Sequence, residues 1–304
     1  MRSWFVGVPL LLAACAASPS SDDGVDTDAD TDTTTEPFAN NPLVHEAMLS
    51  SAHRGGSLLA PEETMEAFQN AVSLGADVLE IDVWSTLDGV IVLNHDPVVD
   101  RTTDGTGNVV GLTWAQLQAL DAGYTFTPDD GATFPYRGVG VKIARLDEVL
   151  AAFPDSLFSI EIKQQSPSII QPVLDLINAA HMHDRVVVGA FDDSVLTQVR
   201  EADPTLLTTL GTTEGFQIYS LTPADEAGYV PPAPFFAAPL EYGPITLAQA
   251  DIEKAHRLGL TLHVWTVNDA ADMDTVISWG ADGIISDDPA TLQTKLEAAG
   301  VAVE

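Results

Sequence analysis

The sequence predicts an α/β protein, a TIM-like (β/α)8 barrel with an insertion after the second strand. From about Leu49 onward, short aliphatic or β-branched runs alternate with amphipathic stretches of helical period, the pattern of repeated βα units around a parallel sheet. Eight such units in roughly 250 residues match the usual size of a closed barrel. No glycine-rich phosphate fingerprint follows the first strand, which argues against a doubly wound open sheet.

The predicted elements alternate along the chain, each strand a short apolar run and each helix a longer amphipathic stretch. Strands are expected at Ser50–His53, Val78–Trp84, Leu157–Ile162, Val186–Ala190, Leu206–Leu210, Phe235–Ala238, Thr261–Val267 and Gly283–Ser286. Helices are expected at Glu62–Leu74, Leu146–Phe153, Ser168–Ala180, Asp193–Ala202, Thr213–Ser220, Thr246–Leu258, Asp269–Trp279 and Pro289–Ala299.

The predicted insertion follows a hairpin at the second strand. An extra strand, Val90–Leu93, comes after Asp88-Gly89, and Asp-Gly is a hairpin signal. The stretch from Asp96 to Arg145 is rich in Gly, Thr and Asp and is longer than an ordinary βα connection. We expect it to form a lid-like excursion beside the active face.

The first residues have the layout of an exported lipoprotein. The apolar run in residues 1–14 is too short to span a bilayer and reads as a secretory signal peptide. The sequence Leu12-Ala13-Ala14-Cys15 resembles the lipobox of bacterial lipoproteins, which implies export and a lipid anchor at Cys15 on a bacterial membrane. The alternative is a cleaved signal peptide with a cysteine nearby by chance.

The composition separates a linker from the barrel domain, and the net charge restricts the kinds of partner that the chain can bind. Residues 15–41 form an acidic Ser/Thr/Asp linker that we expect to be disordered, and residues 42–304 form the barrel domain. The formal net charge is −33, with 12 Lys plus Arg against 45 Asp plus Glu. Nucleic acid is therefore excluded as a partner, because phosphate-backbone binding needs basic patches. The sequence leaves the oligomeric state open.

Acidic residues interrupt two strands that should be apolar on both faces. The alternation of side chains in a strand places Glu80 and Asp82 on one face, toward the barrel axis, and Glu161 in the same position on the next predicted barrel strand. Three close carboxylates repel one another unless a cation lies among them. Oxygen ligands favour one divalent cation, Ca²⁺ or Mg²⁺; a structural Glu–Lys or Asp–Arg network is the alternative.

Two histidines stand at strand ends, His53 after the first strand and His95 after the hairpin. Histidine titrates near neutrality, so a pair on opposite sides of a phosphorus atom can act as general base and general acid. A single histidine at a strand end is more often an ordinary hydrogen-bonded residue.

Together these motifs resemble the glycerophosphodiester phosphodiesterase family in order and approximate spacing. The motifs are His53-Arg54-Gly55, Pro61-Glu62-Glu63-Thr64, Glu80-Ile81-Asp82-Val83, Thr86-Leu87-Asp88-Gly89, His95-Asp96, Arg101-Thr102-Thr103 with Gly105 and Gly107, Glu161-Ile162-Lys163, Trp265-Thr266-Val267-Asn268 and the terminal segment 280–289. The resemblance covers the chain from about Ser50 to Leu296.

The resemblance implies a role for each matching residue. Glu80, Asp82 and Glu161 would hold one divalent cation, and Glu62 would belong to the same metal and phosphate neighbourhood. His53 and His95 would be the acid–base pair. Arg54 and Lys163 would bind phosphate, and Trp265 would form a wall of the glycerol pocket. One position departs from the pattern: the family usually has Asn where this chain has Glu63, to which we assign no role.

The implied reaction is hydrolysis of a small-molecule glycerophosphodiester to glycerol 3-phosphate and an alcohol. In the family, the glycerol hydroxyl next to the ester is thought to attack first, giving a cyclic phosphate that water opens. Two alternatives stay open. One is a lysophospholipase D-type phosphodiesterase acting on lysophospholipids, and the other is a non-catalytic barrel that binds a phosphate ligand.

Overall fold

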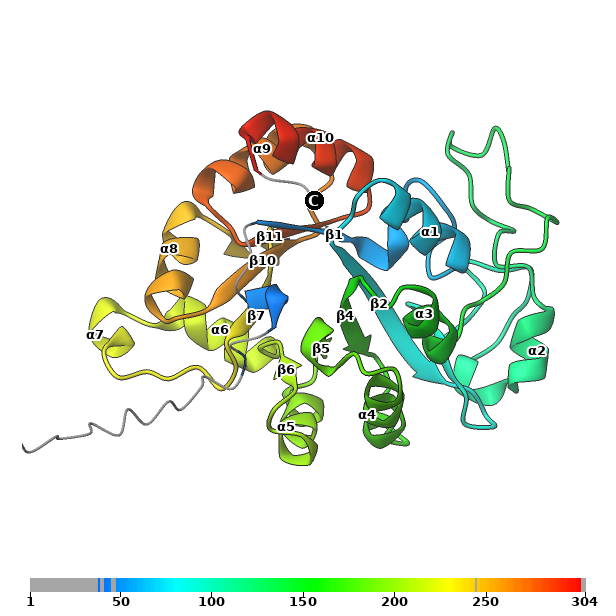
Figure 1. The fold of residues 1–304 in the computed structure, drawn as a ribbon, viewed down its shortest axis with the longest axis horizontal. Helices are drawn as coiled ribbons and strands as arrows, with labels where there is room; N and C mark the ends of the chain where they lie inside the picture. The colour runs from blue at the N-terminus through cyan, green and yellow to red at the C-terminus, as the bar shows by residue number, and fades with distance from the viewer. Residues whose placement is uncertain (1–37, 39–40, 45–47, 244, 302–304) are drawn as a thin grey trace, which may run out of the picture. The chain divides into compact units, whose positions relative to one another are not determined.

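A ring of eight parallel strands surrounded by helices forms the described part of the chain (Figure 1). The computed structural model describes residues 38, 41–44, 48–243 and 245–301, so the expected signal peptide, Cys15 and nearly all of the linker lie outside the described residues. The strands of the ring are β1 (Leu49–Ala52), β2 (Val78–Ser85), β4 (Leu157–Ile162), β5 (Val186–Gly189), β6 (Leu207–Thr208), β7 (Phe235–Pro239), β10 (Thr261–Trp265) and β11 (Gly283–Ser286).

The strand order confirms the predicted barrel. Neighbouring strands pair in the order β6-β5-β4-β2-β1-β11-β10-β7, all parallel. A parallel bridge between Thr209 and Phe235 joins the two ends of this order, so the sheet is nearly closed. The short strand β3 (Ile91–Leu93) pairs antiparallel with β2, as the Asp-Gly turn predicts.

Helices follow the strands at most of the predicted places. They are α1 (Met65–Ser73), α3 (Leu146–Ala152), α4 (Ile170–Ala179), α5 (Asp193–Ala202), α6 (Thr212–Ser220), α7 (Pro223–Glu226), α8 (Gln249–Arg257), α9 (Ala270–Trp279) and α10 (Pro289–Ala299). Helix α1 begins later than predicted because Thr64 caps it, accepting a hydrogen bond from the Ala67 N–H. Helix α8 also begins late, because β8 (Glu241–Tyr242) and β9 (Ile245–Thr246) form a hairpin before it.

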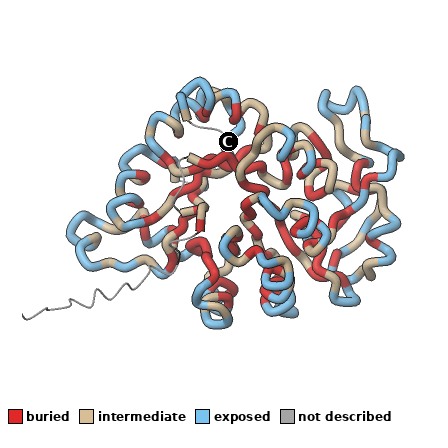
Figure 2. Tube along the Cα trace, in the orientation of Figure 1, coloured by how far each residue is buried: buried red, intermediate tan, exposed pale blue. Residues whose placement is uncertain are grey.

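Apolar side chains on the outer face of the ring make the main core. In Figure 2 the strands of the ring are largely buried, and the helices around it carry buried and exposed stretches. Phe68 of α1 and Phe158 of β4 are both fully buried within this core. Leu79 and Ile81 of β2 point to this core, so the intervening Glu80 and the following Asp82 point to the barrel interior, as strand alternation requires.

Replacing Phe68 by alanine should destabilise the barrel strongly. Phe68 is inaccessible to solvent and meets the ring of Phe153 edge to face at 6.4 Å, so truncation removes contacts and leaves a cavity. We expect a loss of about 3–5 kcal/mol in the free energy of unfolding, measured by urea denaturation. Val230→Ala, at an exposed position, should change this free energy by less than about 0.5 kcal/mol.

The amino-terminal mouth of the barrel is closed by a small apolar cluster. Leu43, in a 3-10 turn at Pro42–Val44, packs with the first residues of β1, β2 and β4. The Asn41 side chain donates a hydrogen bond to the Val186 carbonyl at 3.4 Å, and Phe38 packs against the same cluster. These two residues, assigned to the linker by the predicted boundary, therefore contact the barrel, and any open site lies at the opposite mouth.

The insertion packs beside the barrel rather than over its mouth (Figure 1). It contains a 3-10 turn at Val109–Gly111 and the short helix α2 (Trp114–Ala119), and it has its own apolar cluster around Val99, Val109 and Leu117. None of the described residues from 96 to 145 lines the main cavity. Within the described ranges, no helix has the length and apolar character needed to cross a bilayer.

Candidate active site

A tight turn after β1 presents His53 and Arg54 at the open mouth of the barrel. Arg54 has a φ of 54°, and Gly55 and Gly56 have φ values of 82° and 90°, in the left-handed region that glycine tolerates. A Cβ atom on Gly55 would lie 2.8 Å from the Ala67 Cβ. The glycines after Arg54 therefore allow the chain to turn sharply against α1.

Three carboxylates converge from β2 and β4, as the alternation of residues predicts. Asp82 of β2 is the direct register partner of Glu161 of β4, and Glu80 lies two residues earlier on the same face of β2. One oxygen from each of the three carboxylates lies within 4.8 Å of the others. Glu80 is also fixed by the backbone N–H of Arg54, which donates to its Oε2 at 2.9 Å.

Two cationic side chains, Lys163 and Arg54, form ion pairs with this cluster but leave carboxylate oxygens of Asp82 without hydrogen bonds. The Lys163 Nζ lies 2.8 Å from Glu161 Oε1 and 3.1 Å from Asp82 Oδ1, and Arg54 Nε lies 3.5 Å from Asp82 Oδ2. Burial lowers the pKa of Lys163, but the charges of Asp82 and Glu161 outweigh it and hold that pKa above its ordinary value. Asp82 is only 1% exposed, yet neither of its oxygens accepts a hydrogen bond from the described residues.

The cluster has the chemistry of a divalent metal site. Burial, reinforced by the charge of Asp82, raises the pKa of both Glu80 and Glu161 to about 7, because close ionised carboxylates in a dry site repel one another. An all-oxygen set in which both buried oxygens of Asp82 lack hydrogen bonds suits a hard cation. These residues therefore fit a bound divalent metal, and the donor set does not distinguish one hard cation from another.

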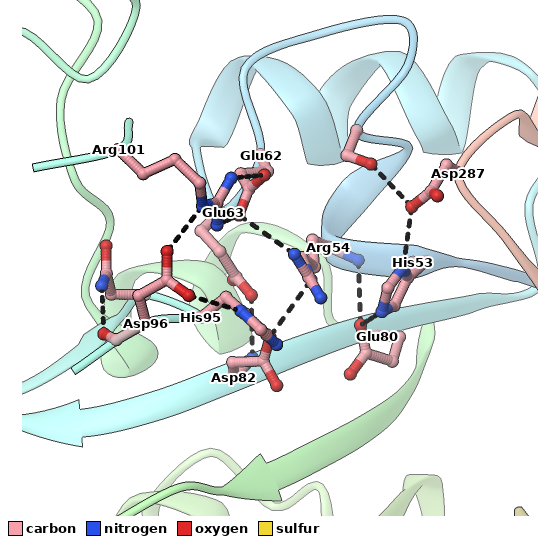
Figure 3. Close-up of polar contacts among 12 residues, drawn as sticks. His53, Arg54, Glu62, Glu63, Glu80, Asp82, His95, Asp96, Arg101 and Asp287 are labelled. Atoms are coloured by element: carbon pink, nitrogen blue, oxygen red, sulfur yellow. Dashed lines mark hydrogen bonds and ion pairs between the residues drawn. The ribbon is translucent and has the colours of Figure 1, made fainter. Parts of the chain in front are cut away.

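His53 is held by Asp287, which follows β11 (Figure 3). The two side chains lie 2.7 Å apart, from His53 Nδ1 to Asp287 Oδ1. Burial alone would raise the pKa of Asp287, but hydrogen bonds from His53, Ser57 and Asn268 lower it to about 2. An ionised carboxylate only accepts, so Nδ1 carries the proton and His53 Nε2 faces the carboxylate side, 3.9 Å from Glu80 Oε2.

The neighbouring carboxylates of Glu80 and Asp287 raise the pKa of His53. Burial lowers this pKa, yet the charge of Glu80 and the hydrogen bond to Asp287 outweigh burial and leave it above its ordinary value.

His95 is held in a parallel way by its neighbour. Its Nδ1 lies 3.0 Å from Asp96 Oδ1, and Asp96 accepts a hydrogen bond from Arg101 Nε. The pKa of Asp96 lies below its ordinary value, since the hydrogen bonds from Arg101 and His95 outweigh the effect of burial. The pKa of His95 itself is lowered, chiefly by burial. Figure 3 shows Arg54 between the two histidines.

Glu62 lies beside the carboxylate cluster but is already paired. Arg101 binds both its oxygens, at 2.7 and 2.6 Å, and Arg54 Nη1 lies 3.4 Å from its Oε1. Glu62 therefore positions Arg54 rather than joining Glu80, Asp82 and Glu161, and it does not line the cavity.

Glu63, which stands where the family usually has Asn, lies behind Asp82. It is 3% exposed with a φ of 60°, and its Oε1 accepts a hydrogen bond from the Asp82 N–H at 3.0 Å. Its Oε2 has no hydrogen-bond partner in the described part of the chain. Burial, with the charges of Asp82 and Glu80, raises the pKa of Glu63 well above its ordinary value, which favours its protonated form.

One cavity of about 200 Å³ gathers most of the residues singled out in the sequence. It is lined by His53, Arg54, Glu80, His95, Glu161, Lys163 and Trp265. Trp265 ends β10 and donates its Nε1–H to the Ala237 carbonyl at 2.9 Å, which fixes its ring in the wall. Asp82 lies beneath the cavity floor and Glu62 beside it, while Cys15 lies outside the described residues.

Three residues that contact this group had no role in the sequence prediction. They are Asp96, Arg101 and Asp287, each present in a motif but without an assigned partner. The sequence positions of Asp287 and Asp96 could have indicated a role in the site. Asp287 directly follows an apolar strand, and Asp96 directly follows the strand-end histidine His95. Their pairing with a particular histidine could not be read from spacing, because His53 and Asp287 are 234 residues apart.

Comparison with known proteins agrees with this site. Residues 53–291 match the model of the glycerophosphoryl diester phosphodiesterase family. A glycerophosphodiester phosphodiesterase of Caldanaerobacter subterraneus is 34% identical over 256 residues, covering 79% of this chain and 94% of that protein, and one of Bacillus subtilis is 30% identical, covering 82% and 86%.

The crystal structure of a glycerophosphodiester phosphodiesterase from Agrobacterium tumefaciens superposes with a TM-score of 0.67 at 26% identity, covering 81% of this chain and 99% of that one. The barrel and the residues that line its cavity both lie almost entirely within residues 53–291, the segment that matches the family model. The chain therefore belongs to the glycerophosphoryl diester phosphodiesterase family and is a phosphoric diester hydrolase.

Proposed function

We propose that the chain hydrolyses glycerophosphodiesters to glycerol 3-phosphate and an alcohol. The observation that carries this proposal is the grouping of three carboxylates, two histidine–aspartate pairs and the two cationic side chains of Arg54 and Lys163 around one cavity. The similarity to enzymes named glycerophosphodiester phosphodiesterases supports the same substrate class.

In this proposal His53 and His95 move the protons. One takes the proton of the glycerol hydroxyl next to the ester as that oxygen bonds to phosphorus, and the other protonates the departing alcohol oxygen. A cyclic phosphate and a free alcohol result, and water opens the ring as the two histidines exchange roles. Arg54 and Lys163 offset the negative charge of the phosphate oxygens.

Glu80, Asp82 and Glu161 would hold one divalent cation, Ca²⁺ or Mg²⁺. When bound, such a cation supplies Lewis-acid polarisation of a non-bridging phosphate oxygen. Two of these carboxylates, Glu80 and Glu161, line the cavity that His53 and His95 also line, so a cation held by them would act on a phosphate bound there.

Product analysis tests the proposal. Purified protein is incubated with glycerophosphocholine and glycerophosphoethanolamine, with and without a chelator, and glycerol 3-phosphate and the free alcohol are measured. We expect equal amounts of the two products, and none in excess chelator. Tight binding of the diester without turnover would favour the non-catalytic barrel, and release of glycerol with a phosphorylated alcohol would contradict the proposed bond cleavage.

Asp287→Asn should impair turnover through His53. The amide cannot stabilise a protonated imidazole as the carboxylate does, so we expect kcat to fall by about 10- to 1,000-fold with little change in KM. Loss of the charge also lowers the pKa of His53, so the matching limb of the pH–rate profile should move to lower pH. An unchanged pH profile, with an unchanged melting temperature, would mean that Asp287 only supports the fold.

We also propose that the protein is exported and lipid-anchored at Cys15. The lipobox-like sequence Leu12-Ala13-Ala14-Cys15 and the acidic linker behind it support this. Expressed in a bacterial host, the chain should partition with membranes and carry labelled fatty acid, whereas Cys15→Ala should lose both properties. Wild-type protein without label in the soluble fraction would contradict the anchor.

A further inference from the structure

Arg101 connects the insertion to the catalytic group without lining the cavity. It lies in the loop after β3, and all three nitrogens of its guanidinium donate hydrogen bonds to carboxylates (Figure 3). The Nε donates to Asp96 Oδ2 at 2.5 Å, while Nη1 and Nη2 donate to the two oxygens of Glu62 at 2.7 and 2.6 Å. Arg101, Asp96 and Glu62 all lie outside the set of residues that line the cavity.

The two acids that Arg101 binds each contact a different side chain of the cavity wall. Asp96 Oδ1 lies 3.0 Å from His95 Nδ1. Glu62 Oε1 lies 3.4 Å from Arg54 Nη1. A continuous series of polar contacts therefore joins the histidine proposed to move a proton to the arginine proposed to bind phosphate, and Arg101 is its middle member.

The geometry of these contacts differs from that of an ordinary surface ion pair. The Arg101 side chain is 46% exposed, and ion pairs of exposed side chains are commonly weak. Glu62, however, is only 12% exposed. A planar guanidinium that binds both oxygens of one carboxylate fixes the orientation of that carboxylate as well as balancing its charge. Hydrogen bonds to Glu62 accordingly outweigh burial and raise the pKa of Arg101 above its ordinary value.

The insertion holds the loop that carries Arg101. The Thr103 hydroxyl donates a hydrogen bond to the Val99 carbonyl at 2.9 Å, and Val99 is buried in the apolar cluster of the insertion. On the other side, the Asn94 side chain donates to the Asp96 carbonyl at 2.6 Å. Packing of the insertion beside the barrel therefore determines where the guanidinium lies.

We propose that Arg101 is a positioning residue that serves proton transfer and phosphate binding at once. It holds the Asp96 carboxylate toward His95. It also occupies both oxygens of Glu62, which keeps that carboxylate from drawing Arg54 away from the phosphate. The inference rests on the proposed function, and it makes the insertion necessary for turnover although the insertion does not cover the mouth.

The contacts of Arg54 agree with this role. Its Nη1 makes one long contact with Glu62, and its buried Nε has no hydrogen-bond partner in the described part of the chain. A guanidinium has five N–H donors, so Arg54 keeps donors for an anion only as long as Glu62 is satisfied elsewhere. Without Arg101, the freed carboxylate would pair with Arg54 instead.

Kinetics of the full chain on glycerophosphocholine test the proposal. Arg101→Ala should lower kcat by about 10- to 100-fold, because Asp96 no longer orients His95, and should raise KM by about tenfold, because Glu62 diverts the phosphate-binding arginine. Arg101→Lys should be impaired on both constants as well, since an ammonium cannot bind both carboxylates in one fork. Melting temperatures identify any loss of fold, in which case Arg101→Lys is the deciding variant.

Arg137→Ala is the matched control. Arg137 belongs to the same insertion and stacks on the rings of Tyr124 and Phe134, so its loss should leave kcat and KM within about twofold of the wild type. An active wild type with Arg101 variants that change only one constant, or neither, would overturn the proposal and leave the proposed function standing. A wild type that releases no glycerol 3-phosphate would overturn the proposed function.

A double variant tests the link between Arg101 and Glu62. Adding Glu62→Gln to Arg101→Ala removes the carboxylate that would capture Arg54, so KM should fall again by about fivefold while kcat stays low. A KM equal to or above that of Arg101→Ala alone would mean that the two losses are independent and would overturn the proposal.

Guanidinium ions test the proton-transfer half. Because the Arg101 side chain is nearly half exposed, the space left by Arg101→Ala is open to a small planar cation. Guanidinium chloride at about 50 mM, far below the molar concentrations that unfold proteins, should raise kcat of this variant by about fivefold relative to sodium chloride at the same concentration. Arg137→Ala should show no such gain. Equal effects of the two salts on Arg101→Ala would mean that Arg101 only supports the fold, which would overturn the proposal.

Discussion

Replacing either His53 or His95 by alanine is expected to lower kcat for glycerophosphodiesters by about 100- to 10,000-fold. Each imidazole lines the cavity and has its Nδ1 fixed by an aspartate, which leaves Nε2 for proton transfer to or from substrate. Steady-state kinetics of choline release from glycerophosphocholine measure the effect. Since the phosphate contacts proposed for Arg54 and Lys163 would remain, KM should change much less than kcat.

A matched control separates chemistry from fold. His256 of α8 is also paired with an aspartate, Asp282, at 2.9 Å, but it lies at the other end of the barrel strands and outside the cavity. His256→Ala should keep kcat within about twofold of the wild type. If both cavity variants instead turn over at the wild-type rate, other groups transfer the protons and the acid–base assignment is wrong.

Asp82→Asn is expected to reduce kcat/KM by at least about 100-fold and to abolish the dependence of activity on Ca²⁺ or Mg²⁺. The substitution removes the one negative charge of the cluster that forms ion pairs with both Lys163 and Arg54. Activity is measured after chelation and stepwise addition of each cation. Glu201→Gln, on the exposed face of α5, is the control and should respond to cations as the wild type does.

The cation should stabilise the fold more at high pH than at low pH. Burial and the charge of Asp82 raise the pKa of Glu80 and Glu161 from 4.5 to about 7. Between these values the folded chain binds more protons than the unfolded chain, so the stability of the metal-free protein falls as the pH rises through this range.

A bound cation replaces those protons. The increase in melting temperature on adding Ca²⁺ or Mg²⁺ should therefore be larger near pH 8 than near pH 5, measured by differential scanning calorimetry. An increment that is the same at both pH values would argue against binding at these carboxylates.

The barrel and the inward direction of its acidic side chains could be predicted because both depend on local periodicity. In β2, each apolar residue that faces the helices alternates with a carboxylate, and the same alternation in β4 brings Glu161 opposite Asp82. The predicted helix boundaries were wrong where a local contact competed with the hydrophobic pattern. Thr246, for example, fits the helical period but pairs in the β8–β9 hairpin.

The finer contacts of the site depend on distant parts of the chain and could not be predicted. Nothing near Glu62 in the sequence indicates that Arg101, 39 residues later, binds both its oxygens. The burial of Glu63 behind Asp82 depends on how the segment before α1 folds against β2, and a polar residue in a loop gives no sign of this.

The pairing of the first and last strands has a consequence for how the protein acquires activity. β1 pairs with β11, and Asp287, directly after β11, accepts the Nδ1 proton of His53, directly after β1. A chain still being synthesised, or one cut short before Asp287, would leave His53 without its acceptor and β1 with an open edge. On the proposed role of His53, catalytic competence is thus the last property that the growing chain gains.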